Sequence, residues 1–163
     1  MFDDLLAANA AYAARFTDSG MAGEAAKGLA ILTCIDSRID PLAIAGLEPG
    51  DAKIIRNAGA RVSEDALRSI ILAVNLLKVE RLCIVHHTEC AMVGRGEEEV
   101  RAKVSAATGH EVGAWDFLAS TDSAATMAAD VATLRGCALL PDSLEIGTFI
   151  FDVHTGELHP VAL

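Results

Sequence analysis

Leu29-Ala30-Ile31-Leu32-Thr33 and Arg81-Leu82-Cys83-Ile84-Val85 are the two stretches that decide the fold of this 163-residue chain. Each is a continuous apolar run that is too short for a helix, which is the pattern of a strand buried on both faces of a sheet. The first run ends at Cys34 and the second at His86 and His87. We therefore expect metal-binding side chains at the carboxyl ends of two buried strands.

Helical and strand patterns alternate along the chain from residue 29 onward. Asp40-Pro41 predicts the start of a short helix through residue 47, and Ser63 is the predicted N-cap of an amphipathic helix that includes residues 67–77. Further segments read as two strands over 53–56 and 148–153 and as two helices over 97–107 and 124–134. This alternation predicts an α/β fold, with residues 1–163 forming a single domain around a mainly parallel sheet flanked by helices.

The first helical pattern spans residues 2–16, where apolar side chains recur at helical spacing. A helix so close to the terminus needs an apolar surface to cover. It can pack on its own domain or on a second subunit, and the sequence alone leaves both arrangements open.

The charge balance of the chain narrows its partners and location. With 13 basic and 23 acidic residues, the formal net charge is −10, which disfavours a nucleic-acid partner and favours a small substrate. Met1-Phe2-Asp3-Asp4 lacks the basic start of a signal peptide, and no apolar run approaches the length of a membrane span. We therefore expect a cytoplasmic protein with no membrane partner, whose four cysteines stay reduced.

Cys34, His87 and Cys90 form a candidate zinc site. Zinc prefers thiolate and imidazole ligands, and three protein ligands leave a fourth position open for water, as in catalytic zinc sites. Asp36 and Arg38 follow Cys34 closely enough for an ion pair beside that position. Three roles stay open for Asp36: it orients the water, it displaces the water and binds zinc itself, or it only caps a helix or pairs at the surface.

Other polar residues near the two motifs have structural explanations. His86 alternates with His87 along a strand and should point to the opposite face, where packing or a hydrogen bond accounts for it. Cys83 lies inside an apolar run and Glu89 should face solvent. The stretch Arg56-Asn57-Ala58-Gly59 predicts a turn with positive φ at the glycine, and its first two residues either support the site or stabilise the turn.

Three motifs in this order resemble the beta-class carbonic anhydrases: Cys34-x-Asp36-Ser37-Arg38, Arg56-Asn57-Ala58-Gly59 and His87-x-x-Cys90. The likeness runs from Thr33 to Met92, and the ending over residues 147–156 is similar to that of the small bacterial members. One departure is Ala91, where the family usually has glycine. If that glycine needs positive φ or close backbone approach, the alanine would alter the pocket.

The resemblance implies a zinc-dependent carbonate dehydratase that interconverts carbon dioxide and bicarbonate through a zinc-bound hydroxide. It implies one zinc ion per chain on Cys34, His87 and Cys90, with Asp36 and Arg38 as the catalytic pair. It also implies a homodimer or homotetramer, with the N-terminal helix against a partner subunit. The same scaffold resembles carbonyl sulfide and carbon disulfide hydrolases, and a non-catalytic zinc or thiol sensor is the alternative from another class.

Overall fold

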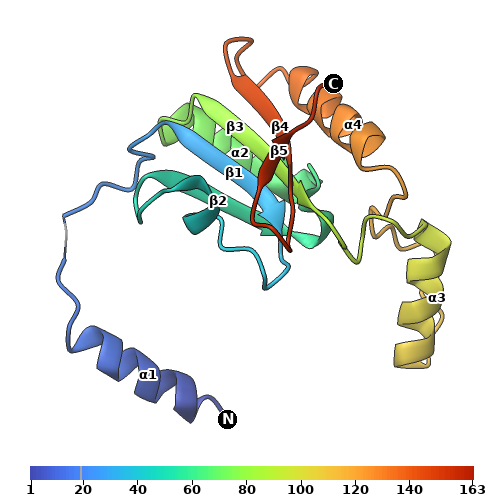
Figure 1. Cartoon of the computed structure of the whole chain (residues 1–163), viewed down its shortest axis with the longest axis horizontal. Helices are drawn as coiled ribbons and strands as arrows, with labels where there is room; N and C mark the ends of the chain where they lie inside the picture. Colours follow the sequence, from blue (N-terminus) through green and yellow to red (C-terminus); the bar gives the residue numbers. More distant parts are fainter. Residues whose placement is uncertain (19) are drawn as a thin grey trace.

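A five-stranded sheet forms the centre of the computed structural model, which describes residues 1–18 and 20–163 (Figure 1). The strand order is β2-β1-β3-β4-β5, in which the first four strands are parallel and β5 is antiparallel to β4. The strands are β1 (Leu29–Cys34), β2 (Ala52–Asn57), β3 (Arg81–His87), β4 (Glu145–Phe151) and β5 (Leu158–Pro160). The predicted α/β fold with a mainly parallel sheet is confirmed.

Two helices, α2 (Glu64–Leu76) and α4 (Ser123–Arg135), cover one face of the sheet. Alternate residues of β1 and β3, such as Leu32 and Ile84, are fully buried against them. The predicted N-cap of α2 is confirmed, because the backbone N–H of Ala66 donates to the Ser63 hydroxyl at 3.4 Å. This face holds the larger of two apolar clusters and fixes the two strands that end at the candidate site.

The opposite face is covered by loops rather than by long helices. Ile39, Ile44 and Leu47 pack there beside the strand residues Ile31 and Val85. The helix predicted from Asp40 to residue 47 is wrong in extent, because only a 3-10 turn, η1 (Ala43–Ala45), forms. Asp40 does accept bonds from the next backbone N–H groups, but Gly46 takes a φ of 63°, which ends the turn early.

Strand β4 (Glu145–Phe151) is shifted relative to the strand predicted over residues 148–153. β4 pairs with β3 from Arg81 opposite Glu145 to His87 opposite Phe151, so the neighbouring strand sets both ends. Beyond Phe151 the chain turns, with the Asp152 carboxylate accepting bonds from two backbone N–H groups. This turn carries the β4–β5 hairpin past the carboxyl end of β3.

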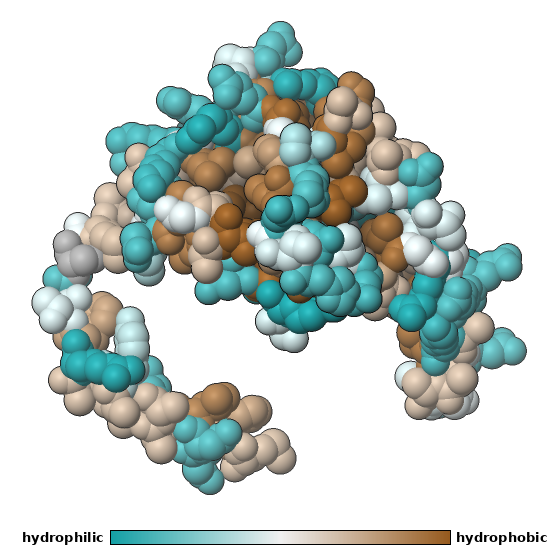
Figure 2. Space-filling view, viewed as in Figure 1, coloured by the Kyte–Doolittle hydropathy of each residue, from teal (hydrophilic) through white to brown (hydrophobic). Residues whose placement is uncertain are grey.

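Helix α1 (Asp3–Ala13) and helix α3 (Glu97–Thr108) project from the body of the molecule (Figure 1). α1 is shorter than the predicted 2–16, and none of its residues is buried. Figure 2 shows it as an arm with apolar surface standing apart from the sheet. Among the described ranges 1–18 and 20–163, no helix combines the length and apolar character needed to cross a membrane.

Candidate metal centre

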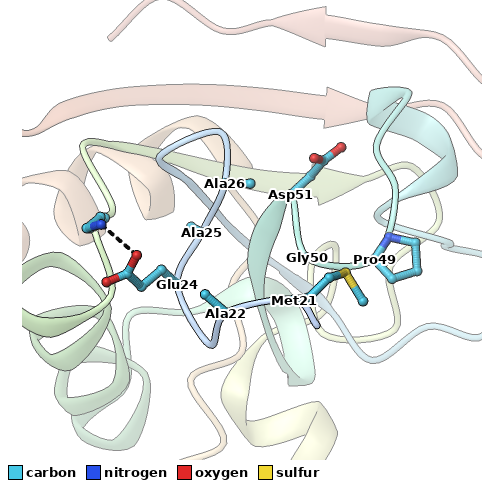
Figure 3. A pocket seen from close by; sticks show the side chains of 9 residues that line it. Met21, Ala22, Glu24, Ala25, Ala26, Pro49, Gly50 and Asp51 are labelled. Carbon is cyan, nitrogen blue, oxygen red and sulfur yellow. Dashed lines mark ion pairs between the residues drawn. The ribbon is translucent and has the colours of Figure 1, made fainter. Parts of the chain in front are cut away.

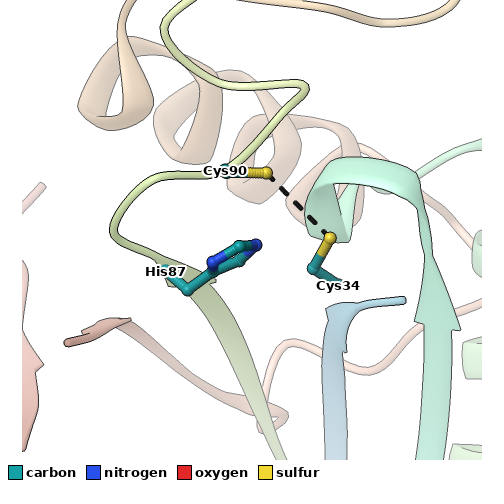
Figure 4. A group of neighbouring side chains, drawn as sticks. All are labelled: Cys34, His87 and Cys90. Carbon is teal, nitrogen blue, oxygen red and sulfur yellow. Dashed lines mark hydrogen bonds between the residues drawn. The ribbon is translucent and has the colours of Figure 1, made fainter. Parts of the chain in front are cut away.

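The ends of β1 and β3 bring three metal-binding side chains together. These strands are parallel neighbours, so Cys34 at the end of one lies beside His87 at the end of the other, and the following turn returns Cys90 (Figure 4). Their ligand atoms all lie within 4.8 Å of one another, and all three residues are buried. The two sulfur atoms are 4.0 Å apart. The sequence motifs, 53 to 56 residues apart, therefore meet at one edge of the sheet.

His87 presents one ring nitrogen to this group. Its Nδ1 lies 2.8 Å from the Thr88 carbonyl oxygen, which can only accept, so Nδ1 carries the proton and Nε2 carries a free lone pair. Nε2 is buried and has no hydrogen-bond partner within the part of the chain that the structure describes. A buried imidazole nitrogen beside two thiols fits a zinc ion, since zinc binds these donors and would satisfy the unpaired atom.

The contact between the two cysteines shifts their thiol pKa values in opposite directions. The hydrogen bond from Cys90 lowers the pKa of the Cys34 thiol, and the same contact raises the pKa of Cys90. The Gly59 backbone N–H also donates to the Cys34 sulfur, at 3.4 Å. Gly59 has the predicted positive φ, 79°, and a side chain there would lie 3.2 Å from Cβ of Met92. This glycine is therefore required both by its turn and by the loop packed against it.

Asp36 and Arg38 form the predicted ion pair next to the donors. Arg38 donates from Nε and Nη2 to the two carboxylate oxygens at 3.0 and 2.8 Å, and from its backbone N–H at 2.9 Å. These bonds hold the pKa of Asp36 well below its usual range. Its Oδ2 lies 3.9 Å from Nε2 of His87. The carboxylate is thus ionised, paired and close to the unpaired nitrogen.

Arg56 supports the loop that carries Cys34 and Asp36. Its side chain donates to the carbonyl oxygens of both residues, at 2.9 and 2.7 Å. Asn57 instead donates to the Arg61 carbonyl and accepts from the Arg61 backbone N–H. Of the two roles left open by the sequence, Arg56 therefore supports the site and Asn57 stabilises the turn.

The turn between His87 and Cys90 contains contacts that the motifs did not reveal. Glu89 is exposed, as predicted, but it accepts from Nη1 of Arg38 at 3.0 Å and pairs with His154 at 3.2 Å. Glu89 also takes a positive φ of 56°. Ala91 is exposed and is not among the residues with positive φ, so the backbone here does not need the conformation that favours glycine.

His86 lies on the far face of the sheet, as alternation predicted. Its Nδ1 is 2.7 Å from the Ser123 hydroxyl at the start of α4, which confirms the expected hydrogen bond. Nearby on this face, Arg61 pairs with the buried Asp130 at 2.9 Å. His86 therefore belongs to the helix-covered side of the sheet and not to the donor group.

A surface hollow of about 420 Å³ lies near the amino ends of the strands (Figure 3). It is lined by residues that precede β1 and β2, including Met21 and Gly50, and by the Glu24–Lys78 ion pair of 2.6 Å. In parallel strands the amino and carboxyl ends lie at opposite edges. This hollow is therefore separate from the three donors.

Fold and site together define an α/β protein with a Cys-His-Cys donor group at the carboxyl edge of a parallel sheet. A family model described as carbonic anhydrase matches residues 29–133. The chain belongs to the beta-class carbonic anhydrases, which are zinc-dependent lyases of the carbonate dehydratase type.

Known proteins similar to this chain include both carbonic anhydrases and a hydrolase. Beta-carbonic anhydrase 1 of Mycobacterium tuberculosis is 29% identical over 159 residues, covering 98% of this chain and 96% of the relative. The crystal structure of carbonic anhydrase from Streptococcus mutans has a TM-score of 0.91 and 32% identity, covering 99% and 97%. Carbon disulfide hydrolase of Acidithiobacillus thiooxidans is 30% identical over 152 residues, covering 80% and 75%.

Proposed function

We propose that this chain catalyses the reversible hydration of carbon dioxide to bicarbonate, with one zinc ion held by Cys34, His87 and Cys90. The observation that carries the proposal is the convergence of three buried donors, one of them an unpaired imidazole nitrogen, in a member of this family. Two cysteines and one histidine leave a coordination position for water, as in catalytic zinc sites.

Zinc in such a site supplies a Lewis acid that lowers the pKa of water to about 7. Asp36, which Arg38 keeps ionised, would accept a hydrogen bond from that water and so direct its lone pair toward the carbon of the substrate. Arg56 fixes the backbone on which this carboxylate and Cys34 stand. The apolar cluster that contains Cys34 and Cys90 limits the access of bulk water to the donors.

The proposal is tested by stopped-flow measurement of carbon dioxide hydration on preparations with graded zinc content. We expect turnover to rise in proportion to bound zinc, up to one ion per chain. A fully loaded preparation that hydrates no carbon dioxide would overturn the proposal.

Hydrolysis of carbon disulfide or carbonyl sulfide is the second candidate function. It is favoured by the likeness to the Acidithiobacillus thiooxidans enzyme, which covers most of both chains. These substrates are linear, like carbon dioxide, and water attacks the same central carbon. Sulfide release, measured beside carbon dioxide hydration on one zinc-loaded preparation, separates the two. Sulfide release without hydration makes the hydrolase the correct assignment, and zinc binding with turnover of neither substrate favours the sensor.

We also propose that α1 packs against a second copy of the chain. The support is its exposed apolar side, on which Leu5, Leu6 and Tyr12 are 60%, 67% and 53% exposed. Leu5→Glu should lower the mass measured by light scattering after size exclusion. Ala11→Glu adds the same charge on the other side of the helix and is the control, expected to keep the assembly. Equal masses for both variants and the parent chain would contradict the proposal.

A further inference from the structure

A chain of four ionisable side chains leads from the donor group to solvent. Asp36 pairs with Arg38, Arg38 with Glu89, and Glu89 with His154, with contacts of 2.8, 3.0 and 3.2 Å. Side-chain exposure rises along it, from 20% at Asp36 to 41%, 58% and 68%. The guanidinium of Arg38 therefore lies between two carboxylates, one at the site and one at the surface.

The Glu89 side chain binds the guanidinium nitrogen of Arg38 that Asp36 does not contact. Asp36 accepts from Nε and Nη2, while the Glu89 side chain accepts from Nη1. The carbonyl oxygen of Glu89 also accepts from Nη2, at 3.4 Å. Since an arginine presents its five N–H donors in one rigid plane, contacts on both edges fix the orientation of that plane.

Glu89 reaches Arg38 from a strained backbone conformation. Its φ of 56° lies in the left-handed region, which residues with a Cβ avoid and which clusters at functional sites. Two bonds tie the preceding residue to the β4–β5 hairpin: the Thr88 N–H donates to the Phe151 carbonyl, and the Thr88 hydroxyl accepts from Val153 N–H. The same hairpin supplies His154. The surroundings thus maintain a strained residue in contact with Arg38.

We propose that Glu89 is a positioning residue, which holds Arg38 so that Arg38 retains the Asp36 carboxylate and keeps it from occupying the open position of the metal. The inference rests on the proposed zinc site and extends it by one residue, at a position that the motif His87-x-x-Cys90 leaves open. The Asp36 carboxylate lies close to the donors, 3.9 Å from Nε2 of His87, and a carboxylate is itself a zinc ligand. If Arg38 loses its contact with Glu89, it retains Asp36 less firmly. The Asp36 carboxylate then binds the metal more often instead of orienting the water.

The test measures access to the metal without requiring turnover. Cobalt(II) replaces zinc in the purified chain, and azide is titrated while the visible absorption of the cobalt is followed. Glu89→Ala should bind azide about two- to fivefold more weakly than the parent chain, a range typical of one exposed ion pair. Glu89→Gln keeps a hydrogen-bond acceptor without the charge and should lie between them, and it serves as the test variant if the alanine variant binds less than one cobalt.

Glu157→Ala is the matched control, because Glu157 lies in the same hairpin and pairs with a histidine, His159, at 3.5 Å. Its azide affinity should equal that of the parent. Unchanged or tighter azide binding in Glu89→Ala overturns the proposal, and so does an equal loss in the control, which would indicate a general charge effect. A parent chain that binds azide but hydrates no carbon dioxide refutes the proposed function and leaves this test intact.

Discussion

Replacing Arg56 tests whether its side chain is needed for metal binding or only for folding. Its two side-chain bonds end on the carbonyl oxygens of Cys34 and Asp36, the first candidate donor and the candidate water-orienting group. Lysine at this position can reach one of these oxygens but not both, because an ammonium lacks the planar fork of a guanidinium. Methionine can reach neither.

The expected effect follows from the number and kind of bonds lost. A hydrogen bond from a charged donor contributes roughly 1.5–3 kcal/mol, and exposure of Arg56 places each of its bonds at or below the lower end. Two such bonds amount to about 1.5–3 kcal/mol in total. If that energy holds the loop in its metal-binding geometry, Arg56→Met should weaken zinc binding about 10- to 100-fold, the range seen when groups behind metal ligands are removed. Arg56→Lys should lose about half of that free energy.

Zinc affinity is measured by competition with a chromophoric chelator, and the fold of each variant is checked by circular dichroism. Arg81→Met is the control, since Arg81 also donates from a strand to a carbonyl oxygen, that of Lys27, but at the amino end of β3. It should bind zinc like the parent chain. An affinity for Arg56→Met within twofold of the parent would refute the reasoning and return Arg56 to a role in the turn alone.

Three further variants test the donor set, the ion pair and the core. Cys90→Ser removes a thiolate and should lose stoichiometric zinc by metal analysis; full occupancy would exclude that cysteine as a ligand. Asp36→Ala should keep zinc but lose most carbon dioxide hydration in stopped flow, and retained activity would remove its proposed role. Asp130→Ala leaves the guanidinium of Arg61 without its carboxylate in a site where the two side chains are 5% and 15% exposed. About 3 kcal/mol of unfolding free energy should be lost in urea, and a loss below about 1 kcal/mol would contradict a buried pair.

The sequence was most informative where periodicity and strand length agreed. The apolar runs at β1 and β3, the alternation of His86 with His87, and the cap at Ser63 each follow from a local rule that tertiary contacts did not override. The pairing of Asp36 with Arg38 was also predictable, because the two residues are neighbours on one turn.

What the sequence could not reveal depends on contacts between distant segments. The bounds of β4 follow from its register with β3, and the short η1 turn follows from the conformation of Gly46. Nothing in the motif His87-x-x-Cys90 shows that Glu89 meets Arg38, since that contact spans 51 positions. The missing signal was the positive φ of Glu89, a backbone property that residue type does not encode.

The parallel pairing of β1 with β3 also determines when, during synthesis, the chain can acquire its metal. Cys34 and Cys90 are separated by 56 positions, so Cys34 leaves the ribosome well before Cys90 has been synthesised. Until β3 has joined β1, the chain offers only isolated thiols and then the short pair His87 and Cys90. Tight zinc binding therefore requires that β1 and β3 have already paired. Incompletely folded chains bind the metal more weakly and compete poorly for it.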